Sequence, residues 1–226
     1  MLFQPKNRGV GDRSQDLSPE GGFTLIELMI VIAIIAVLAG LVTKGIGLAQ
    51  AKAQQAEAIN DINTVLFPSL QAFKSDMGAY PGWDKSPTLD DIEEFNSFPD
   101  VYEALCGRRP PAGRGGRNAP YVELKLDKVV VEDEDGDLLA INSDNDVIGA
   151  FRKADREEQR DPDTEKFYID PWGYPYIYRE NGSKRRKEDW MIKESSFDLW
   201  SIGPDGINSA CEGPDFDEES DDIGNW

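Results

Sequence analysis

The sequence contains no histidine and only two cysteines in 226 residues. Histidine is the commonest general base and the commonest protein ligand of zinc, so its absence weighs against most hydrolases and zinc enzymes. The spacing of Cys106 and Cys211 matches no metal-binding motif. In an exported chain these thiols could form one disulfide, and two cysteines so far apart can equally stay unpaired. We therefore expect a protein that is not an enzyme.

Basic residues are also few. The chain has 24 lysines and arginines against 43 aspartates and glutamates, which gives a formal net charge of −19. Nucleic-acid binding needs basic side chains to neutralise phosphates, so this composition argues against it. Hard divalent cations prefer carboxylate oxygens, so the same composition suits a calcium-binding protein. The length leaves room for one soluble domain beyond a membrane helix.

The most distinctive stretch lies near the N-terminus. Gly21 and Gly22 precede Phe23-Thr24-Leu25-Ile26-Glu27, and a run of apolar residues then continues to Val42. About 20 apolar residues are the length of helix that crosses a bilayer. A carboxylate in such a helix costs about 2.5–3.5 kcal/mol at the centre and less toward the ends, so Glu27 is a functional candidate.

A helical pattern continues over 43–77, where apolar side chains recur every three or four residues. We predict one nearly continuous helix from Thr24 to Asp76 that ends before Gly78, with a kink at Pro68, which lacks a backbone N–H. Segments with strand patterns follow at 121–126, 129–131, 138–141, 170–178 and 197–202. They predict a small antiparallel sheet packed on the second half of the helix. The predicted fold class is α+β.

Four charged segments allow competing interpretations. The acidic turns 133–137 and 142–146 fail the spacing of an EF-hand loop and are interpreted as solvated turns. The basic, Gly/Pro-rich stretch 107–117 predicts either a solvated loop or an electrostatic contact for an acidic neighbour. The many carboxylates of the C-terminal loop, 203–226, repel one another unless they are neutralised. A calcium ion would neutralise them, and the alternative is an acidic solvated tail.

The residues from Gly22 to Glu27, together with the apolar run, resemble the class III leader of type IV pilins and type II secretion pseudopilins. The resemblance implies that a prepilin peptidase cuts after Gly22 and that Phe23 becomes an N-methylated N-terminus. It also implies that Glu27 is the acidic fifth residue of the mature chain and acts in filament assembly. Lys44 departs from the family, which usually has a proline there.

The C-terminal pattern resembles the major pseudopilin in particular. Its parts are Asp170-Pro171-Trp172-Gly173, then Asp198-Leu199 with Ser201 and Gly203, and finally Asp221-Asp222-Ile223 with Trp226. In that family the C-terminal loop folds around a structural calcium ion.

This resemblance also implies the calcium ligands. They are the backbone carbonyl of Ile202, the side chains of Asp205, Asp221 and Asp222, and a further carbonyl near Glu219 or Ser220. The loop is longer than in the family, which makes Asp215 and Asp217 additional candidate ligands.

The implied organisation is a cleaved leader (1–22), a transmembrane and filament-core helix (23–42), its amphipathic continuation (43–77) and a periplasmic pilin-like domain (78–226). Within that domain, 82–169 is an enlarged variable region that the resemblance does not cover.

The implied function is that of a structural subunit of the type II secretion pseudopilus, a helical filament that drives the export of folded proteins. The implied partners are prepilin peptidase, further copies of the chain, minor pseudopilins and an inner-membrane assembly platform. The expected location is the inner membrane, crossed once, with the soluble domain in the periplasm. A type IV pilin for adhesion, motility or DNA uptake is the alternative. A membrane-anchored hydrolase with paired carboxylates in 82–169 is a third interpretation.

Overall fold

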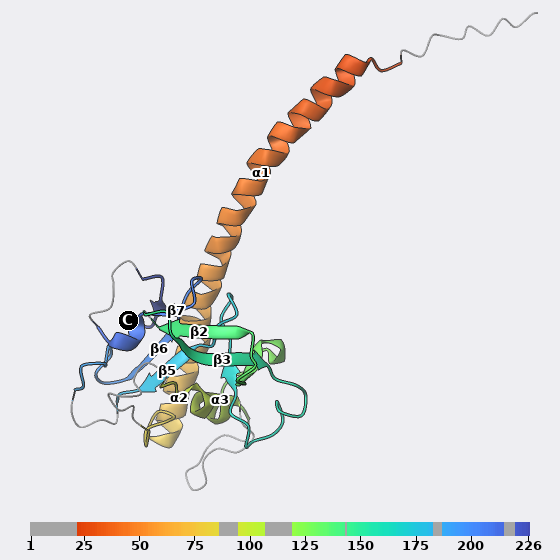
Figure 1. The fold of residues 1–226 in the computed structure, drawn as a ribbon. Coiled ribbons are helices and arrows are strands. Elements are labelled where there is room, and N and C mark those ends of the chain that lie inside the picture. Colours follow the sequence, from red (N-terminus) through yellow and green to blue (C-terminus); the bar gives the residue numbers. More distant parts are fainter. Residues whose placement is uncertain (1–21, 86–94, 107–118, 143, 183–186, 215–219) are drawn as a thin grey trace, which may run out of the picture. The chain divides into compact units, whose positions relative to one another are not determined.

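The structure, a computed structural model, describes residues 22–85, 95–106, 119–142, 144–182, 187–214 and 220–226, without the side chains of 41–45 and 212. The chain divides into two compact units, residues 1–48 and 49–226, which are described separately (Figure 1). All of the predicted leader except Gly22 lies outside the described residues.

The first unit contains the beginning of helix α1 (Leu25–Asn60). Every residue from Gly22 to Gly40 is exposed to solvent in the isolated chain. Over the residues that the structure describes, no helix is both long enough and apolar enough to cross a membrane. The predicted membrane segment, 23–42, ends among the residues whose side chains are not described.

In the second unit the helix continues through a wide turn. A π-helix, η1 (Asp61–Leu66), follows α1 and leads into α2 (Phe67–Met77). Pro68 lies in the first turn of α2, and its missing N–H removes one α-helical hydrogen bond, which accounts for the wide turn just before it. The helix ends at Gly78 as predicted. This glycine has a φ of 88° and its N–H donates to the carbonyl of Lys74 at 2.7 Å.

One apolar stripe of these helices enters the core of the second unit. Ala58, Ile62, Leu66 and Leu70 are all fully buried. Phe67 lies against Phe197, with ring centroids 5.4 Å apart. The predicted packing of this part of the helix on a sheet domain is therefore confirmed, and a further helix, α3 (Phe98–Cys106), covers the same core.

The larger sheet has five strands in the order β4-β1-β3-β2-β7. The strands are β1 (Val129–Glu132), β2 (Leu138–Asn142), β3 (Val147–Lys153), β4 (Phe167–Tyr168) and β7 (Ile207–Asn208). In Figure 1, β2 and β3 run side by side as an antiparallel pair. The pair formed by β2 and β7 is parallel.

The smaller sheet has three strands in the order β5-β6-β8, all antiparallel. They are β5 (Ile177–Glu180), β6 (Phe197–Ser201) and β8 (Ile223–Gly224). The described residues also include two short 3-10 helices, η2 (Leu126–Lys128) and η3 (Ala210–Glu212).

The α+β class is confirmed, and two details of the prediction are wrong. The single antiparallel sheet is in fact two sheets, because the variable region 82–169 contributes four strands of its own. Residues 121–125 form no strand. The N–H of Tyr121 instead donates to the carbonyl of Leu105 at 2.8 Å, which ties this segment to the end of α3.

Candidate functional site

At the N-terminal site, the Glu27 side chain closes the first turn of α1. The backbone N–H and the hydroxyl of Thr24 both donate to the Glu27 carboxylate at 2.8 Å, and the N–H of Glu27 donates back to the Thr24 hydroxyl at 3.3 Å. This reciprocal arrangement is a capping box, with threonine as N-cap and glutamate three residues later. The Thr-x-x-Glu spacing was visible in the sequence, but the capping role was not among the predictions. Next to this turn, Phe23 is 83% exposed.

At the C-terminal site, strand pairing explains how residues far apart in the sequence come together. Strand β8 pairs with β6 so that Ile223 lies opposite Ser201. The residues that follow β6 therefore face those that precede β8. Gly203 has a φ of 70°, and a Cβ atom there would lie 2.7 Å from the carbonyl oxygen of Asp221. Only glycine allows this close approach.

Three of the predicted ligands, Asp205, Asp221 and Asp222, influence one another in this loop. Burial raises the pKa of the Asp221 carboxyl, and the neighbouring Asp205 carboxylate raises it further. Burial raises the pKa of Asp222 to about 7, and the carboxylates of Asp221 and Asp205 act in the same direction. The structure thus brings together carboxylates that a cation would relieve of their mutual repulsion.

The oxygens of Asp222 have different surroundings. Oδ2 accepts a hydrogen bond from the N–H of Ala210 at 2.6 Å, whereas Oδ1 is buried and has no hydrogen-bond partner among the described residues. A buried carboxylate oxygen without a donor is a suitable cation ligand. The described side chains alone do not contain a group of three or more acidic, histidine or cysteine residues that could hold a metal ion.

The remaining predicted ligands add little evidence for or against a calcium site. Asp215, Asp217 and Glu219 lie outside the described residues. The Ser220 hydroxyl accepts a hydrogen bond from the N–H of Asp222 at 3.2 Å. Ile202 is fully buried at the end of β6. Calcium binding therefore stays a prediction at this point.

Asp170, in the Asp-Pro-Trp-Gly motif, supports this C-terminal region. Its Oδ1 accepts hydrogen bonds from three successive backbone N–H groups, those of residues 172–174, each at 2.9 Å. Its Oδ2 accepts one from the hydroxyl of Ser201 at 2.5 Å. Asp170 thus links its own turn to the end of β6, directly before the loop. The motif pointed to the turn, but not to the contact with β6.

Cys106 and Cys211 are not joined by a disulfide in the structure. Cys106 ends α3, whereas Cys211 is buried in η3, where its thiol donates to the carbonyl of Asn208 at 2.9 Å. The carbonyl of Cys211 accepts a hydrogen bond from the buried guanidinium of Arg179 at 3.0 Å. The disulfide that the sequence left open is therefore absent from this structure.

Comparison with known proteins identifies both a matching family model and related proteins. The family model described as the prokaryotic N-terminal methylation motif matches residues 17–43. The type II secretion system core protein G of Pseudomonas aeruginosa is 28% identical over 207 residues, covering 92% of this chain and 95% of that protein. The core protein G of Pectobacterium carotovorum subsp. carotovorum is 38% identical over 81 residues, covering 35% of this chain and 51% of that protein. No solved structure matches the chain.

The methylation motif at the start of a long helix, followed by an α+β domain, defines a membrane-anchored chain of the pilin type. More particularly, the chain is a homologue of the type II secretion core protein G and thus of the pseudopilins. Pseudopilins are structural proteins without enzymatic activity, so this relationship confirms the prediction that the chain is not an enzyme.

Proposed function

We propose that the chain is a structural subunit of the type II secretion pseudopilus, located in the inner membrane with its soluble domain in the periplasm. A prepilin peptidase removes residues 1–22 and the new N-terminus, Phe23, is methylated. The subunit then leaves the membrane and joins a helical filament with further copies and minor pseudopilins, at an inner-membrane assembly platform.

The single observation that carries this proposal is the methylation motif, which leads directly into an uncovered apolar helix. Large apolar side chains between Phe23 and Leu38 are 45–83% exposed in the isolated chain. An apolar surface of this extent is unfavourable in water, so it needs either lipid or other protein around it. Residues 23–42 would have lipid around them before assembly and neighbouring copies afterwards.

Glu27 gives this apolar surface its specificity. In the isolated subunit its carboxylate is satisfied by Thr24 in the capping box. In the filament the same carboxylate would lie among apolar helices, and an unpaired charge there is costly. The cationic amine of Phe23 from a neighbouring copy would offset that cost in one register of packing and not in others.

A structural calcium ion in the C-terminal loop completes the proposal. The carbonyl of Ile202 and the side chains of Asp205, Asp221 and Asp222 would hold it. The buried, unpartnered Oδ1 of Asp222 and the mutual influence of the three carboxylates support this choice. The ion would supply positive charge that neutralises these carboxylates, and the carboxylates would in turn hold the loop against the end of β6.

The decisive experiment compares Glu27→Ala with Glu27→Gln in cells that overproduce the chain together with the peptidase. Glutamine keeps the hydrogen bonds of a capping box but has no charge, whereas alanine has neither. We expect both variants to be cleaved after Gly22, as judged by mass spectrometry of the new N-terminus. We also expect both to form few or no filaments by electron microscopy. Normal filaments from Glu27→Gln would show that Glu27 acts only as a cap.

A further inference from the structure

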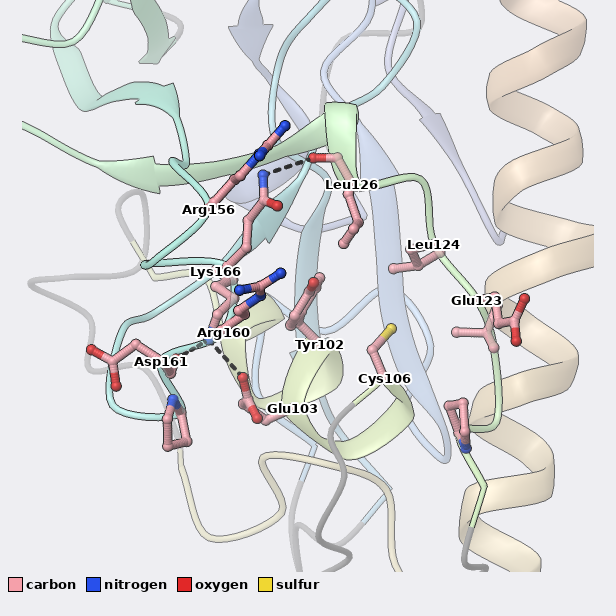
Figure 2. Close-up of a pocket in the computed structure, with 14 residues that line it drawn as sticks. Tyr102, Glu103, Cys106, Glu123, Leu124, Leu126, Arg156, Arg160, Asp161 and Lys166 are labelled. Atoms are coloured by element: carbon pink, nitrogen blue, oxygen red, sulfur yellow. Dashed lines mark hydrogen bonds and ion pairs between the residues drawn. The ribbon is translucent and has the colours of Figure 1, made fainter.

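The second unit has a cavity of about 1130 Å³ that none of the sites above uses (Figure 2). It lies between the end of α3, the extended segment before η2, and the loop that leads to β4. Its wall is largely apolar on one side, formed by Tyr102, Val122, Leu124 and Leu126. All of these residues belong to the variable region 82–169.

Two arginines form the opposite side of this cavity. Arg156 and Arg160 are exposed, and neither guanidinium has an ion-pair or hydrogen-bond partner among the described residues. Lys166 also lines the cavity but is occupied. It is 2% exposed and its ammonium donates to Glu103 at 2.8 Å and to the carbonyl of Thr164 at 2.9 Å. In a chain with 43 acidic residues, two arginines in one cavity that have no partner among the described residues need an explanation.

The arginines are held in place by their own loop. The N–H groups of Arg160 and Asp161 donate to the carbonyl of Glu157 at 3.0 Å, so this segment makes a helical turn. Residues four apart on such a turn project from the same side, as Arg156 and Arg160 do. Gln159 fixes the turn to the cavity wall, because its side-chain amide donates to the carbonyl of Leu126 at 3.1 Å.

The acidic groups of the cavity indicate how a ligand would be oriented. The Asp161 carboxylate is engaged by the N–H of Asp163 and the hydroxyl of Thr164, both at 3.0 Å, and Glu103 binds Lys166. Glu123 lies on the side away from the arginines (Figure 2). A ligand would therefore direct its carboxylates to the arginines and its apolar part to Tyr102 and the leucines.

We propose that this cavity binds an acidic segment with an apolar side chain from a second copy of the chain. Charge complementarity favours this occupant, because the cavity presents two arginines and each copy contains acidic segments that also have apolar side chains. Two of them combine four carboxylates with apolar side chains: residues 89–95, Leu-Asp-Asp-Ile-Glu-Glu-Phe, and residues 215–219, Asp-Phe-Asp-Glu-Glu. The acidic turn 132–137 is less suitable, because it has no apolar side chain and its Asp133 binds Arg152.

The symmetry of such a contact suits a filament. A cavity on one copy that binds a segment of the next is a heterologous contact, and repeated heterologous contacts that do not close build open helical assemblies. The inference rests on the proposed function in this respect, because the filament would bring copies to a high effective concentration. It adds a specific contact made by the variable region.

The test is photo-cross-linking of the full chain in membranes. Benzoylphenylalanine replaces Leu126, which lines the cavity and is 59% exposed, or Leu139, which is 43% exposed on β2 and serves as the control position. Two epitope tags on co-produced copies distinguish links between copies from links within one copy. We expect inter-copy links from position 126, with the linked peptide in 89–95 or 215–219.

Charge reversal then tests the arginines. We expect Arg156→Glu combined with Arg160→Glu to lower the inter-copy links from position 126 about tenfold, because like charges in contact are strongly unfavourable. Lys153→Glu, an exposed charge change on β3, should leave them unchanged. Reversing two carboxylates of the linked segment to lysine should restore the links in the arginine double variant.

Three results would overturn the inference: no links, links only within one copy, or links only to another protein. The proposed function is judged separately, by filaments of the unmodified chain. Filaments without inter-copy links at position 126 would contradict only the cavity contact. Links without filaments would contradict only the pseudopilus role.

Discussion

At the scale of single residues, the buried carboxylate of Asp170 has a structural role, whereas the carboxylates of the C-terminal loop are candidate cation ligands. Asp170 is 2% exposed and accepts four hydrogen bonds, yet burial still raises its pKa to about 6. Its protonated form is therefore favoured in the folded chain relative to the unfolded chain. Asp170 is a structural link whose charge costs stability at neutral pH.

The first prediction concerns the pH dependence of stability. The pKa of Asp170 is higher in the folded than in the unfolded chain, so its contribution is complete below about pH 4 and is lost as pH rises through about 6. We expect the free energy of unfolding to fall by about 2–3 kcal/mol over this range because of Asp170 alone. The measurement is denaturant unfolding of the full chain in detergent at several pH values between 4 and 7.

Asp170→Asn provides the comparison, because asparagine keeps an acceptor for the backbone N–H groups and does not titrate. Its stability should change less with pH than that of the unmodified chain. Ser201→Ala is the matched control, since it removes the hydrogen bond to Asp170, and the one that the hydroxyl accepts from the N–H of Gly203, but leaves the titrating carboxyl in place. Equal pH slopes in Asp170→Asn and the unmodified chain would contradict the assignment.

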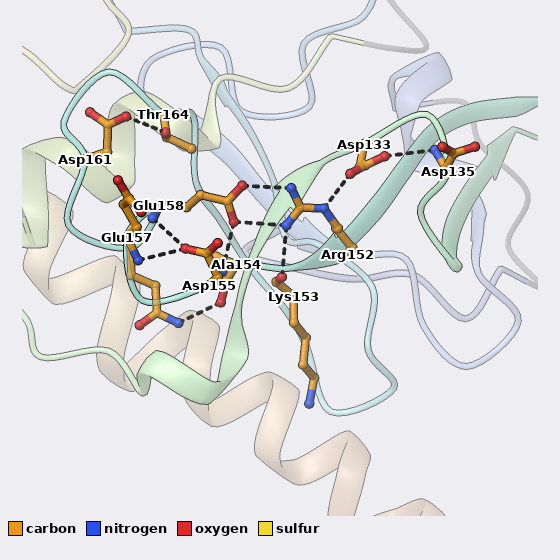
Figure 3. Close-up of polar contacts among 11 residues, drawn as sticks. Asp133, Asp135, Arg152, Lys153, Ala154, Asp155, Glu157, Glu158, Asp161 and Thr164 are labelled. Carbon is orange, nitrogen blue, oxygen red and sulfur yellow. Dashed lines mark hydrogen bonds and ion pairs between the residues drawn. The ribbon is translucent and has the colours of Figure 1, made fainter.

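At the scale of elements, one arginine joins two loops of the larger sheet. Arg152 of β3 pairs with Asp133 in the turn between β1 and β2, and with both carboxylate oxygens of Glu158 at 2.7 and 2.9 Å (Figure 3). Glu158 also accepts a hydrogen bond from the N–H of Asp155 at 2.9 Å. This network orders the same turn that presents Arg156 and Arg160 to the cavity.

We therefore expect Arg152→Met to loosen residues 155–161 with little change in the melting temperature. The ion pairs are at the surface, where they contribute little to global stability, whereas Arg152 links this loop, through Glu158, to the turn around Asp133. Hydrogen exchange followed by mass spectrometry should show faster exchange in this loop and in the turn around Asp133. Lys153→Met is the control and should leave both segments unchanged. Unaltered exchange in Arg152→Met would show that the loop is held by other contacts.

Much of the element pattern could be predicted from the sequence, because it depends on neighbouring residues. The helix end at Gly78, the strands around Val130 and Ile141, and the turn at Asp170 all have local signals. The pairing of these strands could not be predicted in the same way. The parallel pair β2–β7 joins Ile141 to Ile207 across 66 residues, and no local pattern specifies that contact.

The sites also differ in how far apart their residues lie in the sequence. Glu27 and its capping box lie within four residues, so the sequence contained the whole arrangement. The approach of Asp221 to Gly203 depends on the register of β8 against β6, and only the family resemblance pointed to it. The cavity beside Tyr102 depends on three segments of the variable region, and neither the resemblance nor a local pattern indicated it.

At the scale of the whole molecule, excess negative charge is the main obstacle to packing many copies together. A subunit with a formal charge of −19 repels its neighbours, and bound cations reduce this repulsion. Calcium at the C-terminal loop would also connect the end of the chain to β6. Its effect should therefore be visible in the stability of the isolated subunit.

We expect calcium at about one hundred times its dissociation constant to stabilise the full chain in detergent by about 2.7 kcal/mol, which corresponds to about 5–10 °C in melting temperature. A chelator should reverse this shift. Asp222→Asn should lose the response to calcium, whereas Asp137→Asn, an exposed acidic residue between β1 and β2, should keep it. The same melting temperature with calcium and with chelator would exclude a structural ion.

The π-helix η1 has a consequence for how the chain tolerates insertions and deletions. The buried residues Ala58, Ile62, Leu66 and Leu70 are spaced by four, and in a regular α-helix each such step rotates the side chain by about 40°. The wide turn of η1 offsets part of this rotation and keeps Leu70 directed to the core. A one-residue deletion there would close the turn but rotate all of α2 relative to the helix before it. The alignment of the buried residues before and after η1 therefore depends on the length of this six-residue segment. Insertions and deletions should be tolerated in the surface loops but not in η1.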